Sequence, residues 1–219
     1  MTEHRYSEAE RAAVYRAIYE RRDMRHFLPD PIASDVLGRL LDAAHQAPSV
    51  GFMQPWRFIR ITSNALRGQI HALVEQERVR TAKALHERED EFMKLKVEGI
   101  LDCAVVLVAS LCDQREKAVF GRRTMPDMDL ASLACAIQNL WLAARAEGLG
   151  MGWVSLFEPE ELKRLLAMPE GSRPAAILCL GHVERFYEKP MLEQERWAER
   201  MPLDELLFEN RWNSRAGDI

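Results

Sequence analysis

Three arginines and one aspartate lie within five positions, in the segment Arg21-Arg22-Asp23-Met24-Arg25. A guanidinium group binds phosphate oxygens bidentately, so a cluster of this kind can hold a phosphate monoester. The carboxylate of Asp23 is unexpected there, because its charge repels the phosphate that the arginines attract. The alternative interpretation is a solvated helix end, where arginines are favoured by the helix dipole and bind no ligand.

A second candidate segment is the loop 47–56, which reads A-P-S-V-G-F-M-Q-P-W. Its two prolines and its glycine oppose regular structure. The loop is nevertheless apolar, with Phe52, Met53 and Trp56 in it. Most loops run over the protein surface and are polar, so an apolar loop needs a partner. That partner is either another subunit or a flat aromatic ligand.

Three alternate glycines, Gly148, Gly150 and Gly152, open a segment that reads as a strand over 148–155. Glycine at alternate strand positions removes the side chains from one face. The functional interpretation is the close approach of a flat ligand, and the alternative is a bulge or tight packing. The spacing alone leaves both interpretations open.

Hydrophobic periodicity predicts the elements that must position these residues. Helices are expected over 7–21, 34–46, 127–147 and 159–167, and strands over 57–61, 104–109, 148–155 and 174–183. Ser34 is the expected N-cap of the second helix. The helix over 127–147 is apolar on nearly all sides, which places it in a domain centre or a dimer interface. The stretch 64–97 is helical but highly charged, which fits an exposed arm, a lid over a site or a solvated helix.

Composition excludes several functional classes. The 219 residues suit one large domain or two small ones, and a net charge of -4 argues against a nucleic-acid-binding protein. The start lacks an apolar signal-peptide core, and no window reaches the ~20 apolar residues of a membrane span. Four cysteines and six histidines show no metal-binding spacing, so no metal site is expected. The cysteines are expected to be reduced thiols of a cytoplasmic protein.

Four motifs occur in a specific order: R-R-x-x-R at 21–25, P-S-x-x-x-x-Q-P-W at 48–56, G-L-G-x-G-W at 148–153, and R-M-P-L-D-E at 200–205. Together they resemble the nitroreductase family of flavoproteins over nearly the whole chain. The similarity is closest to the branch of that family that fragments its own flavin. Asp23 stands where ordinary nitroreductases have a small residue, and Phe52 where they have asparagine. The segment G-W-V-S at 152–155 also resembles this branch.

The resemblance implies an α+β fold, with a central, mainly antiparallel sheet flanked by helices, built as an intertwined homodimer. It implies one domain over 1–219, with a charged helical lid at 64–97 and a C-terminal arm at 187–219. FMN is expected at the subunit interface. The apolar helix at 130–147 and the apolar arm would then pack against the second copy.

The resemblance also implies roles for individual residues. Arg21, Arg25 and Arg200 would bind the flavin phosphate. The ring and the ribityl chain would be contacted by Arg22, the backbone of Met24, Ser49, Gly51, Gln54, Val154 and Ser155, while Phe52 and Met53 exclude water. Asp23 would accept a proton from the ribityl chain, and Ser155 would shuttle a proton or position the reacting ring. Arg122 and Arg123 receive no role.

The implied reaction consumes reduced FMN and molecular oxygen and yields 5,6-dimethylbenzimidazole and erythrose 4-phosphate. A separate flavin reductase would supply the reduced flavin. One alternative is an NAD(P)H-dependent nitroreductase or flavin reductase of the same fold. Another is a flavin carrier that catalyses nothing.

Overall fold

The computed structural model describes residues 4–214. The chain forms two compact units, which meet in sequence between Phe186 and Tyr187. The first unit contains six helices among its described residues: α1 (Glu8–Glu20), α2 (Ser34–His45), α3 (Asn64–Ala84), α4 (Glu89–Lys94), α5 (Met128–Ala146) and α6 (Pro159–Leu165). Its strands are β1 (Trp56–Ile61), β2 (Val105–Leu111), β3 (Gly150–Val154) and β4 (Arg173–Gly181).

The four strands form one sheet in the order β1-β2-β4-β3, and every neighbouring pair is antiparallel. The continuous apolar run of β2 is buried at every position, as expected for a central strand. The expected antiparallel α+β architecture is confirmed.

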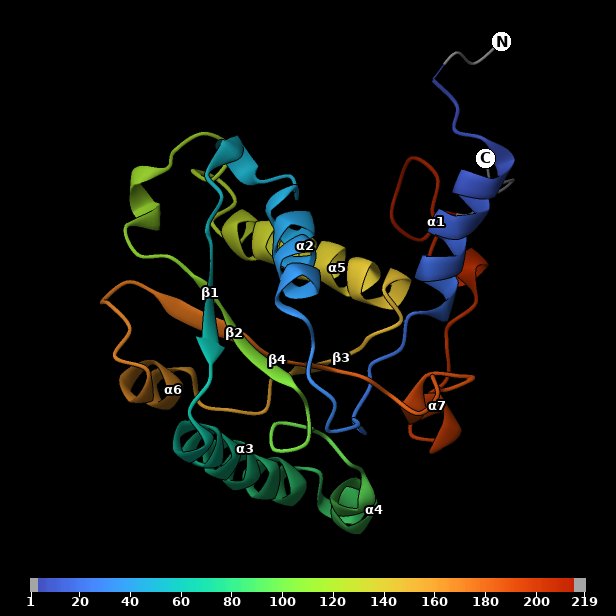
Figure 1. Cartoon of the computed structure of the whole chain (residues 1–219). Coiled ribbons are helices and arrows are strands. Elements are labelled where there is room, and N and C mark those ends of the chain that lie inside the picture. Colours follow the sequence, from blue (N-terminus) through green and yellow to red (C-terminus); the bar gives the residue numbers. More distant parts are fainter. Residues whose placement is uncertain (1–3, 215–219) are drawn as a thin grey trace. The chain divides into compact units, whose positions relative to one another are not determined.

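Helices cover both faces of this sheet, with α2 and α5 on one face and α3 and α6 on the other (Figure 1). Successive side chains of a strand point to opposite faces. Leu107 of β2 therefore packs in the core with α2 and α5, while its neighbour Val106 packs in the core with α3 and α6.

The charged segment 64–97 is partly built into this body. Its helix α3 buries Ile70 and Val74 completely, and α4 buries Phe92. These few apolar residues are enough to fix the helices, because they share one side. The lid function expected of 64–97 stays a prediction.

Two local expectations need correction. Helix α2 begins at Ser34 itself, and its N-cap is Ala33, which makes no side-chain capping bond. Ser34 therefore does not act as the cap. The loop 47–56, expected to be irregular, contains a short 3-10 turn over Val50–Phe52, made possible by the positive φ of Gly51.

Helices α1 and α5 leave apolar surface exposed in the single chain. Helix α1 has no buried residue, and Tyr15, Ile18 and Tyr19 are all exposed. Helix α5 buries Leu133, Ile137 and Leu140 but exposes Cys135 on its outer side. Apolar helix faces of this extent suit a partner surface.

The second unit contains the short helix α7 (Met191–Gln194) and a 3-10 turn over Leu203–Glu205. Its residues Leu203, Leu207 and Trp212 are exposed. The last five residues of the arm expected at 187–219 lie outside the described residues. Within residues 4–214, no helix combines the length and the apolar character that crossing a membrane requires.

Candidate active site at the edge of the sheet

The segment 23–25 runs beside β3 at the edge of the sheet. Asp23 forms a parallel bridge with Met151, and the amide of Met24 donates to the Met151 carbonyl at 2.9 Å. The amide of Trp153 donates to Oδ1 of Asp23 at 3.0 Å. The backbone of one strand therefore fixes both the main chain and the carboxylate of Asp23.

Arg25 holds the other oxygen of the same carboxylate. Its Nη2 donates to Oδ2 of Asp23 at 2.7 Å and to the carbonyl of Trp153 at 2.8 Å. Arg25 is buried, with 8% of its surface exposed, whereas the Asp23 side chain keeps 42% of its surface. The ion pair thus joins a buried cation to a carboxylate that solvent or a ligand reaches from one side.

The surroundings of Asp23 raise the pKa of its carboxyl above the ordinary value, and burial is the main cause. Arg25, the Trp153 amide and Arg21 act in the opposite direction, in that order of strength. The exposed surface and the burial effect are compatible, because neighbouring protein atoms exclude part of the solvent around a side chain that keeps 42% of its surface. A carboxylate with a raised pKa is a better proton acceptor than a surface aspartate.

Tight packing explains two of the three alternate glycines. A Cβ at Gly152 would lie 2.3 Å from the Met24 carbonyl oxygen and 3.0 Å from Nη1 of Arg25. A Cβ at Gly150 would lie 2.5 Å from a methyl group of Val183 and 3.1 Å from Cγ of Met24. Gly148 follows α5 with a φ of +77° and ends the helix. The packing interpretation therefore holds, because the segment 23–25 occupies the space next to Gly150 and Gly152.

Trp141 of α5 fixes the first half of the arginine cluster. The guanidinium of Arg21 lies over the Trp141 ring, 4.4 Å from its centroid. The indole Nε1 of Trp141 donates to the carbonyl of Arg22 at 3.3 Å. Nη1 of Arg22 donates to the carbonyl of Tyr19 at 2.6 Å, at the C-terminal end of α1. Arg22 thus satisfies a carbonyl of the last helical turn.

The loop 49–54 is ordered by its own bonds and by the start of α5. Oγ of Ser49 accepts from the amide of Gln54 at 3.1 Å, and the amide of Val50 donates to Oγ of Ser132 at 3.0 Å. Gly51 has a φ of +53°, and a Cβ there would lie 2.8 Å from the carbonyl oxygen of Phe120. Phe52 is 81% exposed. In the single chain, Phe52 therefore shields no site from water.

Two parts of the expected site lie at different positions along α5. The loop 49–54 is tied to Ser132, and the arginine cluster is tied to Trp141. Nine residues of α-helix separate these anchors, which is a rise of about 14 Å. One chain therefore brings Asp23 and Arg25 into contact and anchors the loop 49–54 at another position of α5.

The remaining expected site residues are placed as follows. The Val154 side chain is buried in the core with α3 and α6, so only its backbone faces the sheet edge. Ser155 is exposed, directly after β3. Arg200 is exposed in the second unit, which is described by itself.

Arg122, which received no role, has a structural one. Buried Asp129 at the start of α5 accepts from Nε of Arg115 at 2.8 Å and from Nε of Arg122 at 3.2 Å. These two ion pairs fix the segment 112–125, which includes Phe120 beside Gly51. Arg123 is exposed, and no role is assigned to it.

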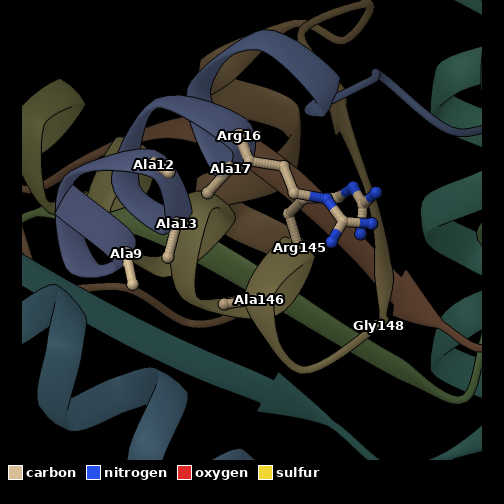
Figure 2. Close-up of a pocket in the computed structure, with 8 residues that line it drawn as sticks. All are labelled: Ala9, Ala12, Ala13, Arg16, Ala17, Arg145, Ala146 and Gly148. Atoms are coloured by element: carbon tan, nitrogen blue, oxygen red, sulfur yellow. The ribbon is translucent and has the colours of Figure 1, made fainter.

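Two further features of the first unit lie apart from Asp23. A groove of about 590 Å³ lies between α1 and the end of α5, and alanines of both helices line it with Arg16 and Arg145 (Figure 2). The second feature is a group of potential metal ligands, His71, Glu75 and Glu98, whose ligand atoms lie within 4.8 Å of one another. Arg78 already pairs with Glu75, and His71 pairs with Glu98 at 3.7 Å.

Residue patterns, sheet topology and sequence comparison agree on the class of protein. Residues 18–182 match the sequence profile of the nitroreductase family. The chain belongs to the nitroreductase family.

The similar proteins include curated relatives that share one enzyme name. A protein of Rhodospirillum rubrum named 5,6-dimethylbenzimidazole synthase is 41% identical over 83% of this chain and 87% of its own length. A protein of Rhodobacter capsulatus with the same name is 37% identical over 91% of this chain and 97% of its own length. The structure of a BluB-like flavoprotein from Clostridium difficile has a TM-score of 0.70, at 18% identity, and covers 90% of this chain and 99% of its own. The resemblance to this branch is confirmed.

Proposed function

We propose that this protein is an enzyme that fragments reduced FMN with molecular oxygen, releasing 5,6-dimethylbenzimidazole, erythrose 4-phosphate and the remaining pyrimidine part of the flavin ring. The two relatives named as 5,6-dimethylbenzimidazole synthase support this assignment. The observation that carries it is the carboxylate of Asp23, which Trp153 and Arg25 hold in a fixed orientation with one side open.

The residues present fit a flavin phosphate and its sugar arm. Arg21 is stacked by its face on Trp141, which fixes the plane of its guanidinium. A phosphate held by Arg21 would place the adjoining sugar arm along the segment 22–24, and the phosphate contact expected of Arg200, which lies in the second unit, stays a prediction. When bound, reduced FMN supplies the electrons that reduce oxygen and the carbon atoms of the benzimidazole product.

Asp23 would accept a proton from a carbon of the ribityl chain. Its inner hydrogen bonds, from the Trp153 amide and from Arg25, fix the carboxylate so that the proton is taken from the open side. Its raised pKa strengthens it as a base. Ser155, exposed directly after the strand that carries Trp153, would position the ring or pass on a proton.

A second copy of the chain would complete the site. The loop 49–54, with Ser49, Gly51 and Gln54, lies about 14 Å along α5 from the anchor of the arginine cluster. The exposed apolar sides of α1 and α5 offer a surface for the second copy. In the homodimer, the loop of one protomer would meet the ring held by its partner, and Phe52 would then exclude water.

Three accessory proposals follow from the same assignment. A separate flavin reductase would deliver the reduced flavin. The segment 64–97 would cover the site once the dimer has formed. The four cysteines of the chain are all free thiols, which suits a reducing compartment such as the cytoplasm.

The substitution Asp23→Asn tests the role of the base. The variant should bind FMN with the affinity of the wild type but form 5,6-dimethylbenzimidazole at least about 100-fold more slowly, the typical contribution of a general base. Asp35→Asn is the matched control, because Asp35 lies exposed on α2, where it pairs with Arg39. Full activity of Asp23→Asn would contradict the proposal.

A further inference from the structure

We propose that Arg25 is a positioning residue for Asp23 rather than a ligand of the flavin phosphate. This inference rests on the proposed function and changes one of its expected contacts. Within the first unit it leaves the phosphate to Arg21, and it assigns to Arg25 the task of orienting the carboxylate that accepts the proton.

The hydrogen bonds of Nη2 of Arg25 are directed into the protein. One nitrogen, Nη2, donates both to Oδ2 of Asp23 at 2.7 Å and to the carbonyl of Trp153 at 2.8 Å. The amide of the same Trp153 donates to Oδ1 of Asp23 at 3.0 Å. Asp23, Arg25 and the Trp153 peptide thus form a closed ring of three hydrogen bonds. A closed ring fixes the rotation of the carboxylate more strongly than either bond alone.

Burial separates the roles of the two arginines. Arg25 is 8% exposed, whereas Arg21 is partly exposed on the Trp141 ring. A buried guanidinium needs a counter-ion close by, and Asp23 already supplies one. If Arg25 turned outward to a phosphate, it would give up the ion pair with Asp23 and the bond to the Trp153 carbonyl.

Gly152 makes this arrangement possible. A Cβ at that position would lie 3.0 Å from Nη1 of Arg25, so any side chain would press on the guanidinium. Because Gly152 has no side chain, Arg25 can take the position from which it orients the Asp23 carboxylate. This accounts for a glycine directly before Trp153 without invoking contact with the ring.

Arg25 also sets the protonation of the base. The charged groups that act on Asp23 are Arg25 and, more weakly, Arg21, and both lower the pKa of its carboxyl against the effect of burial. Removing the charge of Arg25 should therefore raise the pKa of Asp23 further. The rate of product formation would then reach its maximum only at a higher pH, because Asp23 must be ionised to accept a proton.

The test compares Arg25→Met with Arg21→Met. Arg25→Met should change the dissociation constant of oxidised FMN less than about 3-fold, raise the Asp23 pKa measured by carboxyl-carbon NMR on the flavin-free protein, and slow product formation at least about 10-fold. Arg21→Met should weaken FMN binding at least about 10-fold, because it removes a charge-assisted phosphate contact. Arg25→Lys, which keeps the charge, should have an Asp23 pKa closer to that of the wild type than Arg25→Met has.

Two results would overturn the inference. One is a 10-fold or greater loss of FMN affinity in Arg25→Met with an unchanged Asp23 pKa, which would make Arg25 a phosphate ligand. The other, which decides the matter if the methionine variant does not fold, is an Arg25→Lys variant with weakened FMN binding and a wild-type pH profile. The NMR measurement needs no turnover. A failure of the proposed reaction, seen as return of the oxidised flavin without product in the wild type, is therefore distinguishable from a failure of this inference.

Discussion

The main-chain amide of Trp153 donates a hydrogen bond to Oδ1 of Asp23 across a sequence separation of 130 residues. The strand therefore orients the proposed base through its backbone. Backbone groups in a sheet are held by their neighbours in the ladder, so they reorganise little when a proton moves. The predictions below follow from this arrangement and from the surfaces around it.

Gly152→Ala should destabilise the protein by about 1–3 kcal/mol, because the new methyl group would press on the Met24 carbonyl at 2.3 Å. Urea unfolding measures this change. Gly38→Ala is the control, since Gly38 lies inside α2 and a Cβ there meets nothing within 4 Å. The control should gain about 0.5–1 kcal/mol from helix propensity. Equal effects at the two glycines would contradict the packing argument.

Asp23→Asn should gain stability relative to the wild type as the pH rises from 4 to neutral. The folded-state pKa of Asp23 is raised, so the carboxyl favours the folded state below its unfolded pKa and this advantage is lost as pH rises through the folded pKa. The variant has no such loss. The melting temperature of the variant minus that of the wild type should therefore become smaller as the pH falls toward 4. If this difference in melting temperature grew on acidification, the pKa of Asp23 would be lowered in the folded protein instead of raised.

Asp129→Ala should cost about 2–4 kcal/mol, because it leaves Arg115 and Arg122 without their shared carboxylate. The figure is below that for a fully buried pair, since both arginines keep some exposed surface. Asp35→Ala breaks an exposed pair, which solvent screens, and should cost clearly less than Asp129→Ala. Chemical denaturation of the two variants, side by side, checks this difference.

A charge on the outer side of α5 should break the proposed homodimer. Cys135→Glu places a carboxylate on this exposed face, and sedimentation should then show a monomer that binds FMN at least about 10-fold more weakly. Lys83→Glu adds the same residue to an exposed position of α3 and should stay dimeric. A dimeric Cys135→Glu variant with normal FMN affinity would place the interface elsewhere.

Local patterns predicted most of the fold. The apolar run of β2, the three-and-four spacing of α5 and the breaker Gly148 each determine an element within a few residues of chain. The N-cap of α2 could not be placed as well, because Ser34 and Ala33 differ only in which residue first adopts helical angles.

Long-range contacts explain what the sequence left open. The alternate glycines before Trp153 were compatible with a ligand or with packing, and only the crossing of segment 23–25 decides between them. The inward turn of Arg25 depends on Trp153, more than a hundred residues away. Trp141 contacts Arg22, and Arg122 contacts Asp129. Sequence spacing does not predict either contact.

The fate of reduced FMN on the protein tests the central claim most directly. The FMN-loaded protein is reduced without oxygen, air is then admitted, and the released small molecules are identified by mass spectrometry. Our account predicts irreversible loss of the yellow flavin spectrum, with 5,6-dimethylbenzimidazole among the products. Full return of the oxidised flavin spectrum without that product would contradict it and would indicate a flavin reductase or a flavin carrier.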